Sequence, residues 1–254
     1  MSFQILPELS IGFLLIFARI GTLTMLLPGL GERSFPVRVR LSVALLLTLV
    51  FYPLASTFYP SPLGGIPAII GLLIGEIAIG FVLGIAGRIM LGALQTAGTI
   101  IAQQLGLGFV TSLDPSQGQQ GALIGTFLTL LAVAMIFATD LHHLVIAALG
   151  HSYQIFRPGV FPDTGDASKY VAELAAGSFK IAVQISAPVL IFGLIFNVGL
   201  GVLARLMPQM QVFFIAMPAS IILGFALLAL VLAAMMGVYL SYMEQGLNVL
   251  LQRT

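Results

Sequence analysis

The sequence contains no cysteine and no tryptophan, and only 7% of its 254 residues are charged. Without cysteine the chain has no disulfides, no thiolate metal ligands and no cysteine nucleophile. Without tryptophan, an aromatic belt at a membrane interface must use tyrosine and phenylalanine. Soluble domains carry about 25% charged residues. The low charge and the 59% of hydrophobic residues therefore indicate an integral membrane protein or a subunit buried in an apolar assembly.

Signatures of the common enzyme classes and of nucleic-acid binding are also missing. The sequence has no G-x-S-x-G, no P-loop and no G-x-G-x-x-G. The net charge of +1 gives no global attraction to nucleic acid. The N-terminus lacks a basic stretch and an A-x-A site, so we expect the first apolar segment to remain in the mature protein. The sequence predicts a non-enzymatic protein with no catalytic residues, cofactor or metal.

Six apolar segments make up most of the chain. They cover about residues 9–30, 41–58, 66–105, 121–149, 171–204 and 212–243. A helix that spans a bilayer needs about 20 apolar residues, so the first two segments fit one crossing each. The third would reach roughly 60 Å as a helix, twice the hydrocarbon thickness. We therefore expect the long segments to tilt, to break or to extend beyond the bilayer.

Two connections carry further information. Residues 31–40 hold the densest basic cluster, Arg33, Arg38 and Arg40. The positive-inside rule predicts that this loop is cytoplasmic and that the N-terminus lies outside. Near residues 205–211, Pro208 restricts Met207, which predicts that a helix ends or kinks there.

Glycines recur at intervals that suit helix packing. Gly71 and Gly75 are four residues apart, as are Gly80 and Gly84. Small residues at this spacing let helix backbones approach closely. The packing is either within the chain or against another subunit, and the sequence leaves both open.

Ionisable residues inside the apolar segments are candidates for function, because charge is costly at membrane depth. They are Arg19, Glu76, Arg88, Asp140, His142, His143 and Lys180. A proton relay or a substrate path would explain them, and so would pairing between helices or snorkelling near helix ends. Their scattered positions favour pairing or snorkelling.

Asp140, His142 and His143 have the composition of a metal-ligand set. Adjacent histidines point about 100° apart on a helix, so they cannot easily share one ion. No H-E-x-x-H or comparable spacing occurs. We therefore expect a polar cluster at a helix end rather than a metal site.

A polar, glycine-rich loop interrupts the apolar sequence at residues 106–121. Its residues include Gly106, Gly108, Phe109, Asp114, Pro115 and Gln117. Inside a bilayer, irregular backbone is tolerated only where protein buries it or where it lines a watery cavity. The loop is therefore either a surface turn or part of a pore.

Three stretches, in their order and spacing, resemble the FliR family of the flagellar type III protein-export gate. A subunit family of the virulence injectisome is closely similar. The stretches are Arg19–Pro53, with Pro28 and the run from Glu32 to Leu41; Gly75–Phe81, continuing to Ala97–Gly106 and Asp114-Pro115; and Asn197–Gln211, followed by Pro218.

This resemblance implies an all-α membrane protein of long, broken helical hairpins, with a FliP-like part followed by a FliQ-like part, packed in a helical hetero-oligomeric gate. It implies one export-gate subunit over residues 1–254, with a basic-loop and long-helix part over about 1–120 and C-terminal hairpins over about 121–254. The implied function is a channel subunit for unfolded flagellar proteins, in the bacterial inner membrane at the centre of the basal body.

The implied partners are FliP-like and FliQ-like gate subunits, FlhB-like and FlhA-like export components, and unfolded export substrates. The loop at about 106–120 would plug the closed pore through Gly106, Gly108, Phe109, Asp114, Pro115 and Gln117. We expect structural or assembly roles for Arg19, Arg33, Arg38, Glu76, Asn197, Arg205, Pro208 and Gln209. The alternatives are an injectisome gate subunit, or a small-solute transporter with Arg19, Glu76 and Lys180 at its site.

Overall fold

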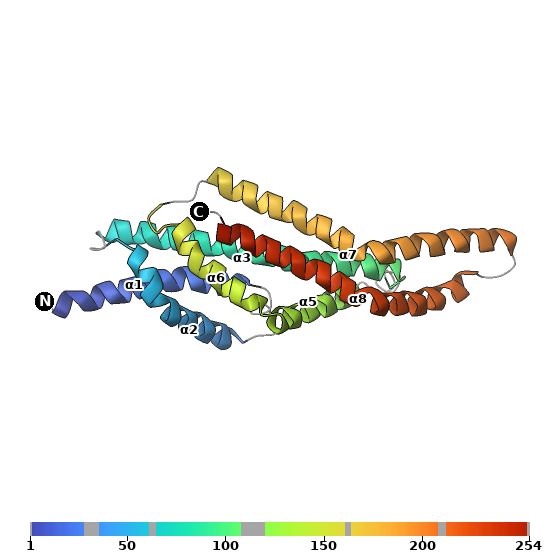
Figure 1. The fold of residues 1–254 in the computed structure, drawn as a ribbon, viewed down its shortest axis with the longest axis horizontal. Coiled ribbons are helices and arrows are strands. Elements are labelled where there is room, and N and C mark those ends of the chain that lie inside the picture. Colours follow the sequence, from blue (N-terminus) through green and yellow to red (C-terminus); the bar gives the residue numbers. More distant parts are fainter. Residues whose placement is uncertain are drawn as a thin grey trace. The chain divides into compact units, whose positions relative to one another are not determined.

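The computed structural model describes residues 2–27, 36–60, 65–107, 120–160, 164–207 and 212–252. Over these residues the fold is all-α, with seven α-helices, one short 3-10 helix and no strand (Figure 1). The elements are α1 (Ser2–Leu26), α2 (Val37–Ala55), η1 (Ser56–Phe58), α3 (Ile66–Gln104), α5 (Gln120–Ala138), α6 (Leu141–Ile155), α7 (Thr164–Leu206) and α8 (Val212–Gln252).

Five stretches within these helices are long and apolar enough to cross a membrane. They are Leu9–Leu26, Val37–Phe58, Ile66–Gln104, Ser168–Leu206 and Ala216–Asn248. Helices α5 and α6 add a sixth if the pair counts as one span. The prediction of an all-α membrane protein is confirmed.

The longest helices are continuous. Helix α3 has 39 residues, α7 has 43 and α8 has 41. At 1.5 Å per residue, α3 extends about 58 Å, so it exceeds the bilayer core without breaking. Pro188 in α7 and Pro218 in α8 each remove one backbone hydrogen bond, which favours a bend at these points.

A break does occur in the fourth apolar segment, which the sequence predicts as one stretch over residues 121–149. Helix α5 ends at Ala138 and α6 begins at Leu141. Asp140, between them, has φ 59°, in the left-handed region. A left-handed residue cannot continue a right-handed helix, and aspartate is one of the few residues that adopt this conformation readily.

The predicted helix end near Pro208 is confirmed. Helix α7 stops at Leu206, Met207 is not helical, and α8 begins at Val212. The ring of a proline clashes with the backbone of the preceding residue when that residue is helical. Pro208 itself and Gln209 lie outside the described residues.

The chain divides into two compact units. Unit 1 comprises Met1–Met90, Thr139–Ala176 and Glu244–Thr254, and unit 2 comprises Leu91–Ala138 and Gly177–Met243. Both units draw on residues from each side of position 120. The division into a basic-loop and long-helix part over about 1–120 and C-terminal hairpins over about 121–254 stays a prediction, as do the FliP-like and FliQ-like parts.

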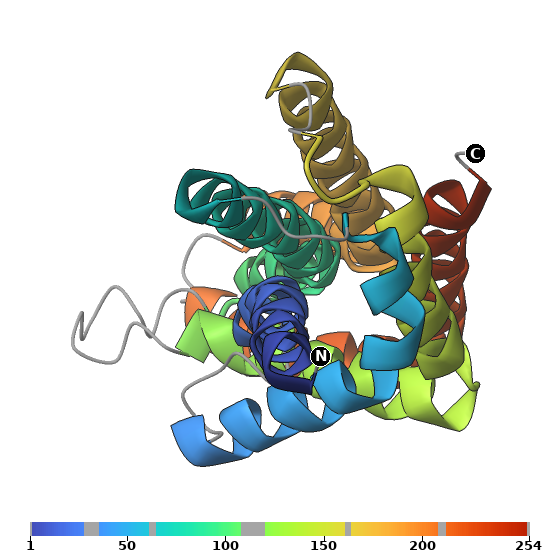
Figure 2. The same ribbon diagram turned by 90° about the vertical axis from the view of Figure 1, so that its left-hand side faces the viewer.

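In unit 1, α1 lies beside α2 and beside the first part of α3 (Figure 2). Helix α6 contacts α2. Side chains from α1, α2 and α6 form a shared core, which contains Ile16, Ile20, Leu23, Phe51, Ala55, Leu149 and Tyr153. Tyr153 of this core contacts Arg19, which is fully buried.

Candidate functional site

Arg19, in the C-terminal half of α1, is fully buried in unit 1 and forms an ion pair with Glu76 of α3, whose side chain is 1% exposed. Its Nε donates to Glu76 Oε2 over 2.5 Å, and its Nη2 donates to Oε1 over 2.9 Å. This two-point contact matches the planar guanidinium to the planar carboxylate, the strongest geometry for such a pair.

The remaining donors of Arg19 reach α6 and the residue after it. Nη1 donates to the backbone carbonyl oxygen of Ser152 over 3.1 Å and to its hydroxyl oxygen over 3.4 Å. Nη2 also donates to the carbonyl oxygen of Phe156 over 2.9 Å. The guanidinium carbon lies 4.0 Å from the centre of the Tyr153 ring, a cation–π contact. All five N–H groups of the guanidinium therefore have acceptors within unit 1.

A second tyrosine borders the same region. Tyr59, just after η1, packs against the core cluster of α1, α2 and α6. Burial first, and the charge of Glu76 next, raise the pKa of the Tyr59 phenol far above its ordinary value. The phenol therefore keeps its proton, and the Arg19–Glu76 pair remains the charged contact of this region.

This arrangement joins helices rather than offering a binding site for a solute. Arg19 has no donor left for an anion, and its pairing with Glu76 agrees with the pairing interpretation of the sequence. Lys180, the third residue of the transporter alternative, is exposed on α7 and belongs to unit 2. The geometry therefore argues against a solute site built on Arg19 and Glu76.

The second glycine pair of α3 packs within the chain. A Cβ atom added to Gly80 would lie 2.5 Å from the carbonyl oxygen of Arg19. One added to Gly84 would lie 2.6 Å from Cβ of Leu26. Helices α1 and α3 thus meet backbone to backbone beside Arg19, and this contact brings Glu76 within reach of the guanidinium.

The first glycine pair is open. A Cβ atom added to Gly71 or Gly75 would have no described atom within 4 Å. Both glycines line a cavity of about 310 Å³ in unit 1, together with Pro60, Ala68, Leu72, Glu76, Ile79, Gly159 and Val160. The two pairs differ because nine residues correspond to about 900° of helix rotation, which places Gly71 and Gly80 on opposite faces of α3.

Gly106, the first residue of the predicted plug loop, ends α3 in a defined way. Its φ is 79°, in the left-handed region. Its N–H donates to the carbonyl of Gln103 over 3.1 Å, and the N–H of Leu107 donates to that of Ala102 over 3.0 Å. These two hydrogen bonds form a Schellman cap, for which glycine is the preferred residue. The cap fixes the direction in which the chain leaves the helix.

The helices on either side of this loop are in close antiparallel contact in unit 2. A Cβ atom added to Gly98 of α3 would overlap the backbone nitrogen and Cα of Gly125 in α5. One turn away, Gln95 Nε2 donates to Thr129 Oγ1 over 3.0 Å. The register of α3 and α5 is defined by two pairs of facing residues, Gly98 with Gly125 and Gln95 with Thr129. The loop therefore begins and ends at the same end of this helix pair.

The end of α3 is also enclosed by α7 and α8. A Cβ atom added to Gly193 of α7 would overlap the side-chain oxygen of Gln104, and one added to Gly224 of α8 would overlap the side chain of Leu105. Three helices therefore use glycines to approach the last turns of α3, which supports the start of the loop on several sides.

The other predicted site residues are not gathered into one place. Arg38 is exposed at the start of α2, and Asn197 and Arg205 are exposed on α7. Arg205 lies in the last turn of α7, where its positive charge interacts favourably with the negative end of the helix dipole. The remaining ones lie outside the described residues: Arg33, Gly108, Phe109, Asp114, Pro115, Gln117, Pro208 and Gln209. Among the described members of this set, Arg19 and Glu76 are in direct contact.

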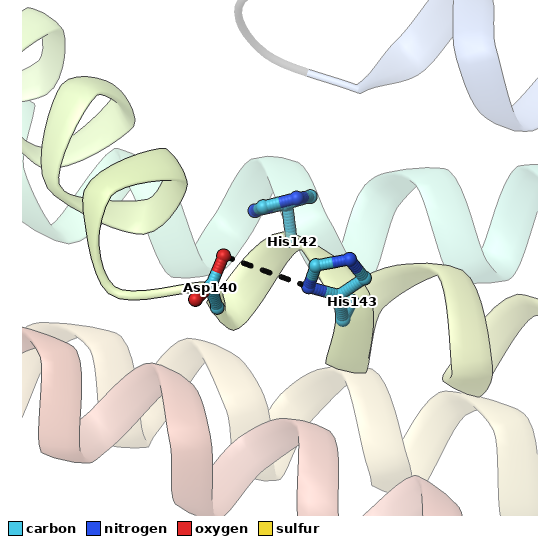
Figure 3. Close-up of side chains that lie close together, drawn as sticks. All are labelled: Asp140, His142 and His143. Atoms are coloured by element: carbon cyan, nitrogen blue, oxygen red, sulfur yellow. Dashed lines mark ion pairs between the residues drawn. The ribbon is translucent and has the colours of Figure 1, made fainter.

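Asp140, His142 and His143 lie together at the start of α6, as expected for a polar cluster at a helix end (Figure 3). Asp140 Oδ1 is 3.7 Å from His143 Nδ1. The two imidazole rings are tilted by 35° with their centres 4.1 Å apart. The two histidine side chains adopt conformations that bring their rings together, although adjacent residues of a helix point about 100° apart.

The acceptors for Arg19 in α6 and just after it were not predicted from the sequence. Apart from the Ser152 hydroxyl, they are the backbone carbonyl groups of Ser152 and Phe156, and a carbonyl group, which every residue has, carries no sequence signal. The opposite orientation of the two glycine pairs, in contrast, was available from a helical projection of α3. The contact of Gly98 with Gly125 depends on the register between α3 and α5, which neither segment's own sequence reveals.

Comparison with known proteins shows which family the chain belongs to. The family model of bacterial export proteins, family 1, matches residues 10–246. The flagellar biosynthetic protein FliR of Caulobacter vibrioides is 40% identical over 238 residues, covering 92% of this chain and 94% of that protein. FliR of Bacillus subtilis is 32% identical over 225 residues, covering 87% and 86%.

A third relative is the Yop proteins translocation protein T of Yersinia pestis, which is 28% identical over 232 residues and covers 88% of this chain and 87% of that protein. The resemblance to the FliR family is confirmed by matches that run along nearly the whole chain. The all-α membrane fold and these matches agree, and the chain belongs to the family of bacterial export proteins, family 1.

Proposed function

We propose that this protein is a non-enzymatic subunit of a flagellar type III export gate, in the bacterial inner membrane at the centre of the basal body. With FliP-like and FliQ-like subunits it forms the channel for unfolded flagellar proteins, and FlhB-like and FlhA-like components join this gate. The observation that carries the proposal is the 40% identity to a flagellar FliR over 92% of the chain.

The loop at about 106–120 is proposed as the plug of the closed pore. Two features of its described flanks support this role. The Schellman cap at Gly106 fixes where the loop starts, and the contact of Gly98 with Gly125 holds the helices on both sides of it. The loop sequence is polar but has one charge, at Asp114. Such a segment moves between protein and water at lower cost than a strongly apolar or highly charged one.

The open glycine pair is proposed as a contact surface for another gate subunit. Gly71 and Gly75 leave room for a helix to approach the backbone of α3 closely. The neighbouring cavity of about 310 Å³ adds space beside the two glycines, while Glu76 in its lining is 1% exposed and is already paired with Arg19.

An injectisome role is the second candidate, because the Yersinia translocation protein is also a relative. Its identity of 28% is below the 40% and 32% of the two flagellar proteins, so the flagellar assignment is favoured.

Coexpression tests the proposal. The chain, carrying an affinity tag, is produced with the FliP-like and FliQ-like proteins of the same genome, and an unrelated tagged membrane protein serves as the control. Capture of both partners in a fixed ratio, by the tagged chain alone, is the expected result. A chain that purifies as a monomer or a homo-oligomer, with neither partner, contradicts the proposal.

A further inference from the structure

Asp140 occupies a position at which aspartate normally caps a helix, but it does not serve as a cap. It is the N-cap residue of α6, and its side chain makes no capping hydrogen bond. A capping residue has extended backbone angles, which aim its carboxylate at the free N–H groups of the first turn. Asp140 instead has φ 59° and ψ 11°, and its carboxylate faces His143. The carboxylate therefore makes no capping hydrogen bond and can act as a ligand for an ion.

Three potential ligand atoms converge at this point. One carboxylate oxygen of Asp140 and one imidazole nitrogen each from His142 and His143 all lie within 4.8 Å of one another (Figure 3). Some point lies within about 2.8 Å of all three such atoms, and the bonds of Zn²⁺ to nitrogen or carboxylate oxygen are about 2.0–2.2 Å. Movement of each atom by less than about 1 Å, with rotation of the two rings to aim their nitrogen lone pairs at the ion, therefore completes the site.

We propose that Asp140, His142 and His143 bind one divalent transition-metal ion at the start of α6. Two imidazoles and one carboxylate are the ligand types of Zn²⁺ and Ni²⁺, whereas Mg²⁺ and Ca²⁺ prefer oxygen ligands alone. In the isolated chain Asp140 and His143 are 79% and 71% exposed, so the described residues leave the fourth position of a tetrahedral ion open to water.

Such an ion would connect the turn before α6 to the first turn of that helix. Asp140 lies outside α6, and both histidines lie within its first turn. The charge of the ion is unfavourable at a helix N-terminus, where the helix dipole is positive, and the Asp140 carboxylate offsets this. The ion would hold Asp140 in its left-handed conformation. Asp140 is the residue at which the fourth apolar segment breaks.

The third histidine of the chain provides a matched control. His151 also lies in α6, eight residues beyond His143 and outside the cluster. Asp140→Asn is a conservative probe of the carboxylate, because asparagine also adopts the left-handed conformation readily. The full-length protein is purified with a tag that contains no histidine, and size-exclusion profile and helix content are checked for every variant.

The test is titration with Zn²⁺, followed by calorimetry, in the presence of excess Mg²⁺. We expect one Zn²⁺ per chain, bound more weakly as the pH falls because protons compete for the imidazoles. Loss of even an outer-shell partner costs about 10–100-fold in metal affinity, so His143→Gln and Asp140→Asn should each weaken binding at least tenfold. His151→Gln should leave the affinity unchanged.

Substitution by cobalt identifies the ligands independently. Co²⁺ bound in place of Zn²⁺ should give visible absorption bands typical of a four- or five-coordinate ion, and these bands should be absent in the double variant His142→Gln/His143→Gln. The proposal is overturned if the wild-type protein shows no saturable Zn²⁺ binding. It is equally overturned if folded Asp140→Asn and the double variant bind Zn²⁺ as tightly as the wild type.

Discussion

Arg19 and Glu76 are 57 residues apart in the chain and form a two-point ion pair in the interior of unit 1. Through the same guanidinium, α1 and α3 are joined to the carbonyl groups of Ser152 and Phe156. The pair stands among apolar side chains, where a lone charge is expensive. Loss of one partner of this pair should therefore lower the stability of the protein.

Arg19→Met should destabilise the protein strongly. Removal of one partner of a buried pair leaves the other charge uncompensated, which costs about 3–5 kcal/mol. Here the Glu76 carboxylate is left behind, together with the carbonyls of Ser152 and Phe156. The measurement is the loss of helix on heating the detergent-purified protein, followed by circular dichroism.

The double variant Arg19→Met/Glu76→Met separates charge from packing. Replacement of both partners by apolar side chains is often close to neutral, so most of the lost stability should return. Equal thermal midpoints for the single and double variants would show that the buried charge is not the cause.

Gly98→Ala should weaken the packing of α3 on α5. The new methyl group would overlap the backbone of Gly125, and backbone cannot rotate away as a side chain can. Overpacking of this kind costs about 1–3 kcal/mol. Gly92→Ala is the matched control, since Gly92 is in the same helix and unit and no described atom lies within 4 Å of a Cβ added there.

At Gly92 the substitution should stabilise the helix by about 0.5–1 kcal/mol, because alanine loses less conformational entropy. Thermal unfolding of the two variants side by side is the measurement. If Gly98→Ala is as stable as Gly92→Ala, the close contact of α3 with α5 is incorrect.

Long apolar runs allowed the helices to be predicted from the sequence, because membrane spans depend on composition over about 20 residues. The end of α7 before Pro208 was also predictable, because proline acts on the residue next to it. These features depend on neighbours in the sequence, so no knowledge of the fold was needed.

Other features depend on what lies opposite in space. The partner of Arg19 could be any of several buried charges, and the carbonyl groups of α6 leave no trace in the sequence. Asp140 stops a helix inside an apolar stretch through its own backbone conformation, which hydropathy does not detect. Gly71/Gly75 and Gly80/Gly84 have the same spacing, but the spacing does not tell which face another helix occupies.

Gly71→Leu should reduce copurification of FliP-like and FliQ-like subunits while leaving the chain itself stable. No described atom lies within 4 Å of a Cβ added at Gly71, so the described residues accommodate leucine there, but it fills the space proposed for the partner helix. The measurement is the yield of each partner per tagged chain, relative to the wild type.

Gly80→Ala supplies the contrast, because its Cβ would meet the carbonyl oxygen of Arg19 within the same chain. That variant should lower the thermal midpoint of the isolated protein, whereas Gly71→Leu should not. A complex of normal yield and composition with Gly71→Leu would remove the support for this surface.

The central claim is that the loop at about 106–120 closes the gate, and deletion of residues 110–118 tests it most directly. The deletion leaves Gly108, Phe109 and Gln119 between the described ends of the loop, and helical hairpins are commonly closed by 2–8 residues. The contact of Gly98 with Gly125 does not involve the deleted residues, so the helices should still pack and the gate should still assemble. The measurement is the ion conductance of membranes from cells that produce the mutant gate at verified normal levels. The account predicts an assembled gate that leaks ions, and a fully assembled mutant gate in a tightly sealed membrane would contradict it.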